Sequence, residues 1–309
     1  MAVCEGERHL SAAVDSVFEQ THSGFELIVI DDGSTDHSCA ILERYRDPRL
    51  RVVRQENQGA AAALDAGLRL ARGESIAFLD QDDVWNKEKL AEHIAVLGRH
   101  PEIDLTFSWY RMIDPHGREI GLRSRRHRGT VPFASLLADF VIGATSNIVV
   151  RRAALERAGG IDRAFPRLYD LDLSLRVALL SSDNILAIPR DLMLYRRHGF
   201  QITRNPRALE PEWENLLSKF HKLAPREFAQ VEKLARSNMK RYLACLEYEN
   251  TRYLQGVELL REGFTIAPFR FLIDSRNWLA TAACLSGALL PSPWHSQLER
   301  IAGLRRDGS

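Results

Sequence analysis

The chain has 309 residues, of which 45% are hydrophobic and 27% charged, so it can bury a sizeable core and divide into a main domain and an appendage. A formal net charge of +1 gives no field for binding polyanions, so we expect no nucleic-acid partner. Four widely spaced cysteines argue against a disulfide framework or a structural zinc site and fit a reducing cytosol. The most apolar late stretch, Trp278 to Leu290, is too short to span a bilayer. We therefore expect a cytoplasmic protein, soluble or peripheral on the inner face of the membrane.

The first hundred residues alternate between helical and strand patterns. Segment 10–18 repeats its apolar residues with the period of a helix packed on one face. The elements predicted after it are a strand at 25–30, a helix at 40–42, a strand at 50–54, an alanine-rich helix to 71 and a strand at 75–79. Short connections between alternating elements predict a mainly parallel sheet flanked by helices.

The rest of the chain is less regular. Mixed topology is expected after residue 100, with strands at 104–110 and 147–150 and helices at 87–98, 132–140, 153–158 and 169–179. From 208 to 309 the patterns have helical period and few strand formers, so we expect an α-helical C-terminal appendage.

Two acidic clusters follow strand patterns. Asp31 and Asp32 end the first strand, and Asp80 to Asp83 follow the strand at 75–79. The carboxyl ends of parallel strands are where open α/β sheets bind ligands. Crowded carboxylates repel one another unless a cation compensates them, so Mg²⁺ or Mn²⁺ is the economical explanation. The alternative is that both clusters are ordinary solvated turns, in which Asp, Gly and Ser are common.

Two further acids lie at the start of the helix predicted at 169–179. Asp172 is spaced to pair with Arg176 one turn later, the usual structural role of a helical carboxylate. Asp170 projects about 200° away from Asp172, so the two cannot share one role. Asp170 either caps the helix or points at a substrate.

Five ordered motifs together resemble the family 2 glycosyltransferases. They are FELIVIDDGSTD at 25–36, GESIAFLDQDD at 73–83, RRAALERAGGID at 151–162, YDLDL at 169–173 and YRRH at 195–198. The resemblance covers the first two-thirds of the chain and implies a GT-A fold, Rossmann-like, in a domain at 1–207. Residues 1–100 would bind the nucleotide sugar and 101–207 the acceptor, with the helical extension at 208–309. Members transfer sugars from nucleotide-sugar donors with inversion at the anomeric carbon.

The resemblance also assigns roles to the acids of the donor half. Asp32 corresponds to the residue that binds the base of the nucleotide, and Asp31 supports it. Asp80 and Asp82 match the first and last acids of the DxD motif. Asp80 would lie toward the ribose and Asp82 toward a divalent metal, Mn²⁺ or Mg²⁺, that bridges the diphosphate and offsets the charge of the leaving group.

Two residues of the second half complete the implied site. Asp170 matches the catalytic base that deprotonates the acceptor hydroxyl. His198 lies where members often carry a histidine, and it is a candidate contact for the metal or the diphosphate. A packing or surface histidine is an equally good interpretation of His198.

The chain departs from the family pattern in three places. Tyr169 stands where members usually have an acid, and Leu64-Asp65 replaces a usual Arg-Asn pair. Members begin with a buried strand that leads to an aromatic residue, whereas this chain has Cys4 at that position, three residues from its start. We therefore expect a strand encoded upstream of Met1, without which neighbouring strands would expose unpaired backbone.

The tail allows two interpretations. Phe269 to Ile273 and Trp278 to Trp294 mix aromatic, aliphatic and arginine residues, as an interfacial anchor near a lipid-linked acceptor would. The same residues would also form the core of the appendage.

The sequence as a whole predicts an inverting, metal-dependent glycosyltransferase with a nucleoside-diphosphate sugar donor and a saccharide or lipid-linked acceptor, in bacterial surface polysaccharide synthesis. One alternative is a catalytically silent binding subunit. A sugar nucleotidyltransferase is disfavoured because the glycine-rich, arginine-containing opening loop of those enzymes is absent.

Overall fold

The computed structural model describes residues 1–199 and 205–290. The chain divides into two compact units. The first unit comprises Met1–Leu136 and Phe140–His198, and the second comprises Leu137–Asp139 and Gly199–Ser309.

The first unit begins with a parallel sheet of order β1-β2-β3, made by Ala2–Val3, Leu27–Asp32 and Leu50–Gln55. All six residues of β2 are buried because its two faces are covered. Leu27 and Val29 pack in a cluster with α1 (Leu10–Phe18), whereas Ile28 and Ile30 pack on α3 (Ala60–Leu70). This alternation follows from the two-residue period of a strand. The short helix α2 (Ser38–Leu42) lies between β2 and β3 in sequence.

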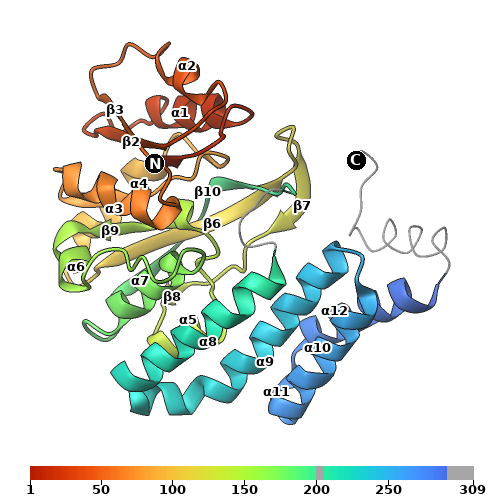
Figure 1. Cartoon of the computed structure of the whole chain (residues 1–309). Helices are drawn as coiled ribbons and strands as arrows, with labels where there is room; N and C mark the ends of the chain where they lie inside the picture. Colours follow the sequence, from red (N-terminus) through yellow and green to blue (C-terminus); the bar gives the residue numbers. More distant parts are fainter. Residues whose placement is uncertain (200–204, 291–309) are drawn as a thin grey trace. The chain divides into compact units, whose positions relative to one another are not determined.

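A second, mixed sheet carries the strand order β4-β9-β6-β10-β5, with β7 paired to β6 and β8 to β10. The strands are β4 (Ser75–Ala77), β5 (Val84–Trp85), β6 (Leu105–Ile113), β7 (Glu119–Arg123), β8 (Gly129–Thr130), β9 (Val149–Arg151) and β10 (Ile185–Arg196). Only β6 and β10 run parallel, and they lie side by side through the unit in Figure 1. The mixed topology expected for the second half is therefore present, and the parallel part is the first sheet.

The long strand β10 was not predicted from the sequence. Pro189, Arg190 and Asp191 interrupt its apolar pattern, and the register with β6 shifts on both sides of Asp191. A strand with such bulges has no simple two-residue period, so its sequence does not predict a strand.

Helices of the first unit surround this second sheet. They are α4 (Lys89–Arg99), the start of α5 (Phe133–Ala138), the 3₁₀ turn η1 (Thr145–Asn147), α6 (Arg152–Arg157) and α7 (Tyr169–Ala178). The strand expected at 147–150 begins only at Val149, because the polar residues before it form η1.

An apolar cavity of about 780 Å³ lies in the first unit between residues of the two sheets. Leu27 and Ile28 of β2 line it together with Ser75 to Ala77 of β4. Strand β1 extends the first sheet over only two residues, paired with Ile30 and Asp31, so the start of β2 borders this cavity. The strand expected upstream of Met1 stays a prediction.

The described part of the second unit is helical from residue 205 to residue 290, as the sequence predicts (Figure 1). Its helices are α8 (Pro206–Leu223), α9 (Pro225–Glu249), α10 (Tyr253–Ile266), α11 (Pro268–Ile273) and α12 (Ser275–Leu289). Proline opens three of them, where its fixed φ and missing N–H cost nothing. None of the helices in the described ranges has both the length and the apolar character needed to cross a membrane.

Gly143 tests how tightly the loop before η1 is packed. Its φ is +82°, and a Cβ there would overlap the hydroxyl and ring of the buried Tyr110. We expect Gly143→Ala to lower the free energy of unfolding by about 2 to 4 kcal/mol, from the left-handed backbone and the overlap together. Urea unfolding followed by tryptophan fluorescence measures the loss.

Gly160→Ala is the matched control, because Gly160 has φ of +70° and no atom within 4 Å of the added Cβ. It should lose only the conformational part, about 1 to 2 kcal/mol. Equal losses for the two variants would show that the contact with Tyr110 contributes nothing.

Candidate functional site

The acidic loop after β4 is held from two sides. The backbone N–H of Asp80 donates to Ser146 Oγ at 2.9 Å, which fixes the loop to η1. The Gln81 amide pairs reciprocally with the backbone of Cys4, accepting from its N–H at 2.8 Å and donating to its carbonyl at 2.9 Å. The side-chain amide of Gln81 thus makes with Cys4 the pair of hydrogen bonds that a neighbouring strand would make. This contact joins the acidic loop to the first sheet.

The end of β10 closes the loop from a third side. The backbone N–H of Arg196 donates to Asp83 Oδ1 at 2.9 Å, and its Nε donates to the carbonyl of Asp82 at 2.7 Å. Its Nη1 reaches the carbonyl of Asp114 at 3.1 Å. Arg196 is 4% exposed, so its guanidinium is a buried clamp on the backbone of the acidic loop. Its role as a clamp has no signal in the sequence.

His198 and Asp82 meet directly. His198 Nε2 lies 2.7 Å from Asp82 Oδ2, and both side chains are mostly buried. His9, at the start of α1, places its ring centroid 5.5 Å from that of His198. Burial, followed by the charges of Arg196 and His198, lowers the pKa of His9. Two residues 116 positions apart thus come together, and the contact of His198 with a metal or diphosphate stays a prediction. Nothing in the sequence pointed to His9.

Asp170 belongs to the same acidic cluster. Its Oδ2 accepts a hydrogen bond from Thr145 Oγ1 at 3.3 Å, and its Oδ1 accepts one from the N–H of Leu171. The N-cap of α7 is Leu168, without a side-chain cap, so Asp170 is not the cap that the sequence allowed. Burial, and then the carboxylates of Asp82 and Asp170, raise the pKa of Asp80 to about 7. Asp80, Asp82 and Asp170, three of the predicted site residues, are therefore close enough to interact electrostatically.

The two acids at the end of β2 are already engaged by the chain. Asp32 is 2% exposed and accepts from the N–H groups of Gln58 and Gly59 at 2.9 and 2.8 Å, and from Gln55 Nε2 at 2.7 Å. It therefore holds the start of α3, which the sequence analysis did not foresee. Asp31 is fully buried and accepts from the Ser34 N–H at 3.0 Å, and its supporting role in donor binding stays a prediction. Binding of a nucleotide base by Asp32 stays a prediction.

The departure at Tyr169 places a phenol, not an acid, beside Asp170. The Tyr169 side chain is 5% exposed and its hydroxyl lies 3.3 Å from Thr145 Oγ1. Burial, and then the charges of Asp80 and Asp170, raise its pKa well above the usual range. Tyr169 is thus a neutral neighbour of the acidic cluster.

Asn147 of η1 is the centre of a buried polar network that the sequence analysis read as part of a strand. Its Nδ2 donates to the carbonyls of Ser108 and Ile142 at 2.7 and 2.9 Å, and its Oδ1 accepts from the Ser108 hydroxyl at 2.9 Å. Lys89 Nζ lies 3.5 Å from the same oxygen and 3.3 Å from His93 Nε2. A run of three polar residues before an apolar strand, Thr145 to Asn147, was the available signal.

Asp172 has the structural role that its spacing predicts. Its Oδ2 accepts from Arg176 Nη2 at 2.6 Å and from Nε at 2.8 Å, and the carboxylate is fully buried. Arg176 also donates to the carbonyl of Gly160 at 2.8 Å, which fixes α7 to the turn after α6. This pair stabilises α7, on which Asp170 lies.

The donor set around Asp82 fits a hard divalent ion that also takes oxygen ligands from a substrate. Within residues 1–199 and 205–290, no group of three His, Cys, Asp or Glu side chains is arranged to hold a metal alone. Mg²⁺ is usually held by one or two carboxylates together with substrate phosphates and water. The Asp82 carboxylate would supply one such oxygen ligand, whereas the His198 imidazole, 2.7 Å from it, is a nitrogen donor outside the usual Mg²⁺ set.

The acidic loop follows β4, and the ends of strands are where α/β folds bind ligands. Residues 1–159 match the family model described as glycosyl transferase family 2. This chain belongs to that family, and its first unit has the GT-A fold.

Curated relatives agree with this assignment. An uncharacterised glycosyltransferase of Nostoc is 30% identical over 200 residues, which are 62% of each chain. WfgD of Escherichia coli, named as a UDP-Glc:α-D-GlcNAc-diphosphoundecaprenol β-1,3-glucosyltransferase, is 29% identical over 217 residues, covering 68% of this chain and 81% of WfgD. The chain thus spans less than two-thirds of the first of these relatives.

Solved structures share the fold. TarS of S. aureus, in complex with UDP-GlcNAc, has a TM-score of 0.63 at 18% identity and covers 92% of this chain and 88% of that one. The mannosyltransferase PcManGT of Pyrobaculum calidifontis, in complex with GDP-Man and Mn²⁺, has a TM-score of 0.55 at 19% identity, with 98% and 83% covered.

Lys89 gives the first unit a pH-dependent stability. Burial lowers the pKa of this fully buried amine to about 7. From pH 10 down to pH 7 the unfolded chain holds the proton and the folded chain does not, so the free energy of unfolding falls as pH falls and levels off below pH 7. We expect Lys89→Met to flatten this slope and to raise stability at pH 7 by about 1 to 4 kcal/mol.

Urea midpoints measured at several pH values test this expectation. Lys87→Met is the control, because Lys87 is exposed two residues earlier and should leave the slope unchanged. An unchanged slope in Lys89→Met would show that another group carries the pH dependence.

Proposed function

We propose that this chain is an inverting glycosyltransferase that moves a sugar from a nucleoside-diphosphate sugar to an acceptor hydroxyl. The observation that carries the proposal is the meeting of Asp80, Asp82 and Asp170 in one acidic cluster, joined by His198. These residues come from three separate segments of the chain. Neighbouring carboxylates repel one another, which destabilises the fold. Such clusters are typical of sites that bind a cation and a phosphate ester.

The donor half supplies binding. Residues 1–100 would hold the nucleotide, with Asp32 toward the base and Asp80 toward the ribose. Asp82 and His198 would hold Mn²⁺ or Mg²⁺ against the diphosphate. When bound, the metal stabilises the negative charge that develops on the β-phosphate oxygen of the leaving group. Arg196 keeps Asp82 in place by its hydrogen bond to the Asp82 carbonyl.

The acceptor half, 101–207, would supply the base. Asp170 takes the proton of the acceptor hydroxyl while the acceptor oxygen bonds to the anomeric carbon and the bond from that carbon to the phosphate oxygen breaks. A single displacement of this kind inverts the anomeric centre. Thr145 Oγ1 donates to Asp170 Oδ2 and orients the carboxylate, and positioning carries much of the effect of a general base.

The relatives support a proposal for the acceptor class. WfgD is named for a lipid-linked acceptor, and TuaG of Bacillus subtilis, 43% identical over 89 residues, for teichuronic acid biosynthesis. We infer that this chain also acts in bacterial surface polysaccharide synthesis, on a saccharide or lipid-linked acceptor. The second candidate function is a silent nucleotide-binding subunit, favoured by the buried Tyr169 where members carry an acid.

Asp82 tests the donor site. We expect Asp82→Ala to weaken Mn²⁺-dependent binding of a nucleotide sugar by at least tenfold, because the charge opposite the metal is lost. Calorimetry against a panel of nucleotide sugars, with and without Mn²⁺, first identifies the donor and then measures the variant. Asp47→Ala removes a carboxylate paired with Arg49 before β3 and should bind as the parent does. Parent-like affinity in Asp82→Ala would contradict the metal assignment.

Asp170 tests the chemical step. Asp170→Asn should keep donor binding and lose about 10² to 10⁴ in turnover, because only the base is removed. Asp172→Asn is the control: it breaks the buried pair with Arg176, so it should lower the melting temperature while the folded enzyme still transfers sugar. Transfer at near the parent rate by Asp170→Asn would exclude it as the base. Donor binding without turnover in the parent would favour the silent subunit.

A further inference from the structure

The solvent face of α12 is more apolar than the face that packs. Trp278, Ala282, Leu285 and Leu289 follow one another at spacings of four, three and four residues, so they share one side of the helix. Trp278 is 53% exposed and Leu289 76%. The opposite side carries the buried Asn277 and Cys284, the latter packed in the core of the second unit. The outward stripe is about 16 Å long, from a rise of about 1.5 Å per residue.

The short helix α11 continues the same apolar character. Phe269 is 73% exposed and Ile273 60%, and Leu272 between them is also exposed. On α12, Leu279 next to Trp278 is 71% exposed. Side chains exposed to this degree protrude from the surface, whereas the apolar residues of a preformed groove are shielded by its walls. We call the set Phe269, Leu272, Ile273, Trp278, Leu279, Leu285 and Leu289 the apolar ridge.

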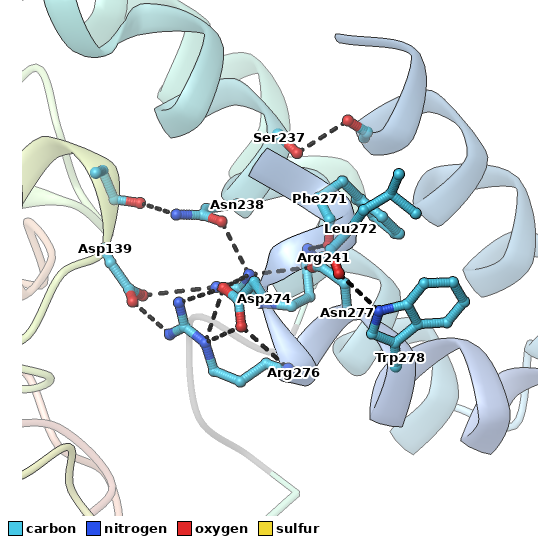
Figure 2. A network of polar contacts seen from close by, with 12 residues as sticks. Asp139, Ser237, Asn238, Arg241, Phe271, Leu272, Asp274, Arg276, Asn277 and Trp278 are labelled. Carbon is cyan, nitrogen blue, oxygen red and sulfur yellow. Dashed lines mark hydrogen bonds and ion pairs between the residues drawn. The ribbon is translucent and has the colours of Figure 1, made fainter. Parts of the chain in front are cut away.

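The base of the ridge is held rigidly (Figure 2). Asp274 caps α12 through the N–H of Arg276 at 3.0 Å and accepts from its guanidinium at 2.6 Å, which lowers the pKa of Asp274 to about 2. Arg241 of α9 donates to Asp274 at 3.1 Å and to Asn277 Oδ1 at 3.1 Å.

Trp278 is fixed to α11. Its indole N–H donates to the carbonyl of Leu272 at 2.9 Å, so the polar end of the side chain is satisfied while the ring stays half exposed. The ridge is therefore an ordered surface that presents large apolar side chains to solvent, and exposure of this kind marks an interaction site.

Charge decides which partner fits. Asp274 is the sole acidic residue between 263 and 290, and it is neutralised by Arg241 and Arg276. Arg270 of α11, next in sequence to Phe269 of the ridge, is exposed. Arg241 and Arg276 are paired with Asp139 and Asp274, so Arg270 carries the charge of this surface. A second copy of the chain would bring two Arg270 side chains toward one another across a twofold axis, whereas anionic lipid headgroups complement Arg270. Protruding side chains also enter a soft acyl layer without a matching hollow.

We propose that the apolar ridge docks on an anionic lipid bilayer, with α11 and α12 lying in the plane of the interface. Trp278 and Phe269 insert below the headgroups, and Arg270 contacts lipid phosphates. The proposal does not rest on sugar transfer, so it is tested without substrate.

Co-sedimentation of the full chain with vesicles is the test. We expect binding to phosphatidylglycerol/phosphatidylethanolamine vesicles and at least tenfold weaker binding to pure phosphatidylcholine. The double variant Trp278→Ser with Leu279→Ser should lower the partition coefficient on anionic vesicles at least tenfold, and Arg270→Glu should lower it several-fold on anionic vesicles only. Circular dichroism confirms that each variant keeps its helical content.

Leu223→Ser is the matched control, because Leu223 is 56% exposed at the end of α8 and outside the ridge. Its partition coefficient should equal that of the parent. Absence of vesicle binding by the parent overturns the proposal, as does an equal loss in Leu223→Ser. A dimer seen by light scattering that the double variant dissolves, together with no vesicle binding, would assign the ridge to a second copy instead.

Discussion

The repulsion among carboxylates in the loop that joins β4 to β5, the two edge strands of the second sheet, is the constraint on which the site of the first unit depends. Asp80, Asp82 and Asp83 are consecutive or nearly so, and Asp170 adds to their field from α7. Burial raises the pKa of Asp83 well above the usual range, and the charges of Asp82 and Asp80 add to that. Such a cluster persists only if surrounding groups hold it, and backbone donors, Arg196 and His198 do so. The same arrangement leaves a demand for positive charge that a divalent cation would meet.

The support for this cluster comes from polar groups buried behind it. Asn147 satisfies both ends of its amide within the core, so it costs little and fixes η1 against β6. Lys89 differs from Asn147, because the polar contacts of its buried amine are between 3.3 and 3.5 Å long. Burial without close partners disfavours the charged form and lowers its pKa. The buried Lys89 thus lowers the stability of the first unit while its neighbours hold the residues of the site in place. Such a loss of stability is common at functional sites.

Both units have an apolar core, and each departs locally from the usual distribution of polar and apolar side chains. In the first, the polar groups of interest are inside, at strand ends and in η1, and β2 is buried on both faces. In the second, the buried side of α12 holds an asparagine and a cysteine while leucines and a tryptophan face outward. An ion-pair network, not an apolar core, fixes the start of α12, so its apolar side chains remain available for a partner.

Local sequence determined the repeating elements and the identity of the acids. The short apolar run of β2, the helical period of α1 and α8 to α12, and the pairing of Asp172 with Arg176 depend on near neighbours and were predictable. The family motifs also named the acidic cluster. Tertiary structure alone decided what those acids contact: Asp32 holds α3, Asp82 meets His198 across 116 residues, and β10 forms despite Pro189 because β6 pairs with it. Such contacts depend on how distant segments pack, and no local period in the chain encodes them.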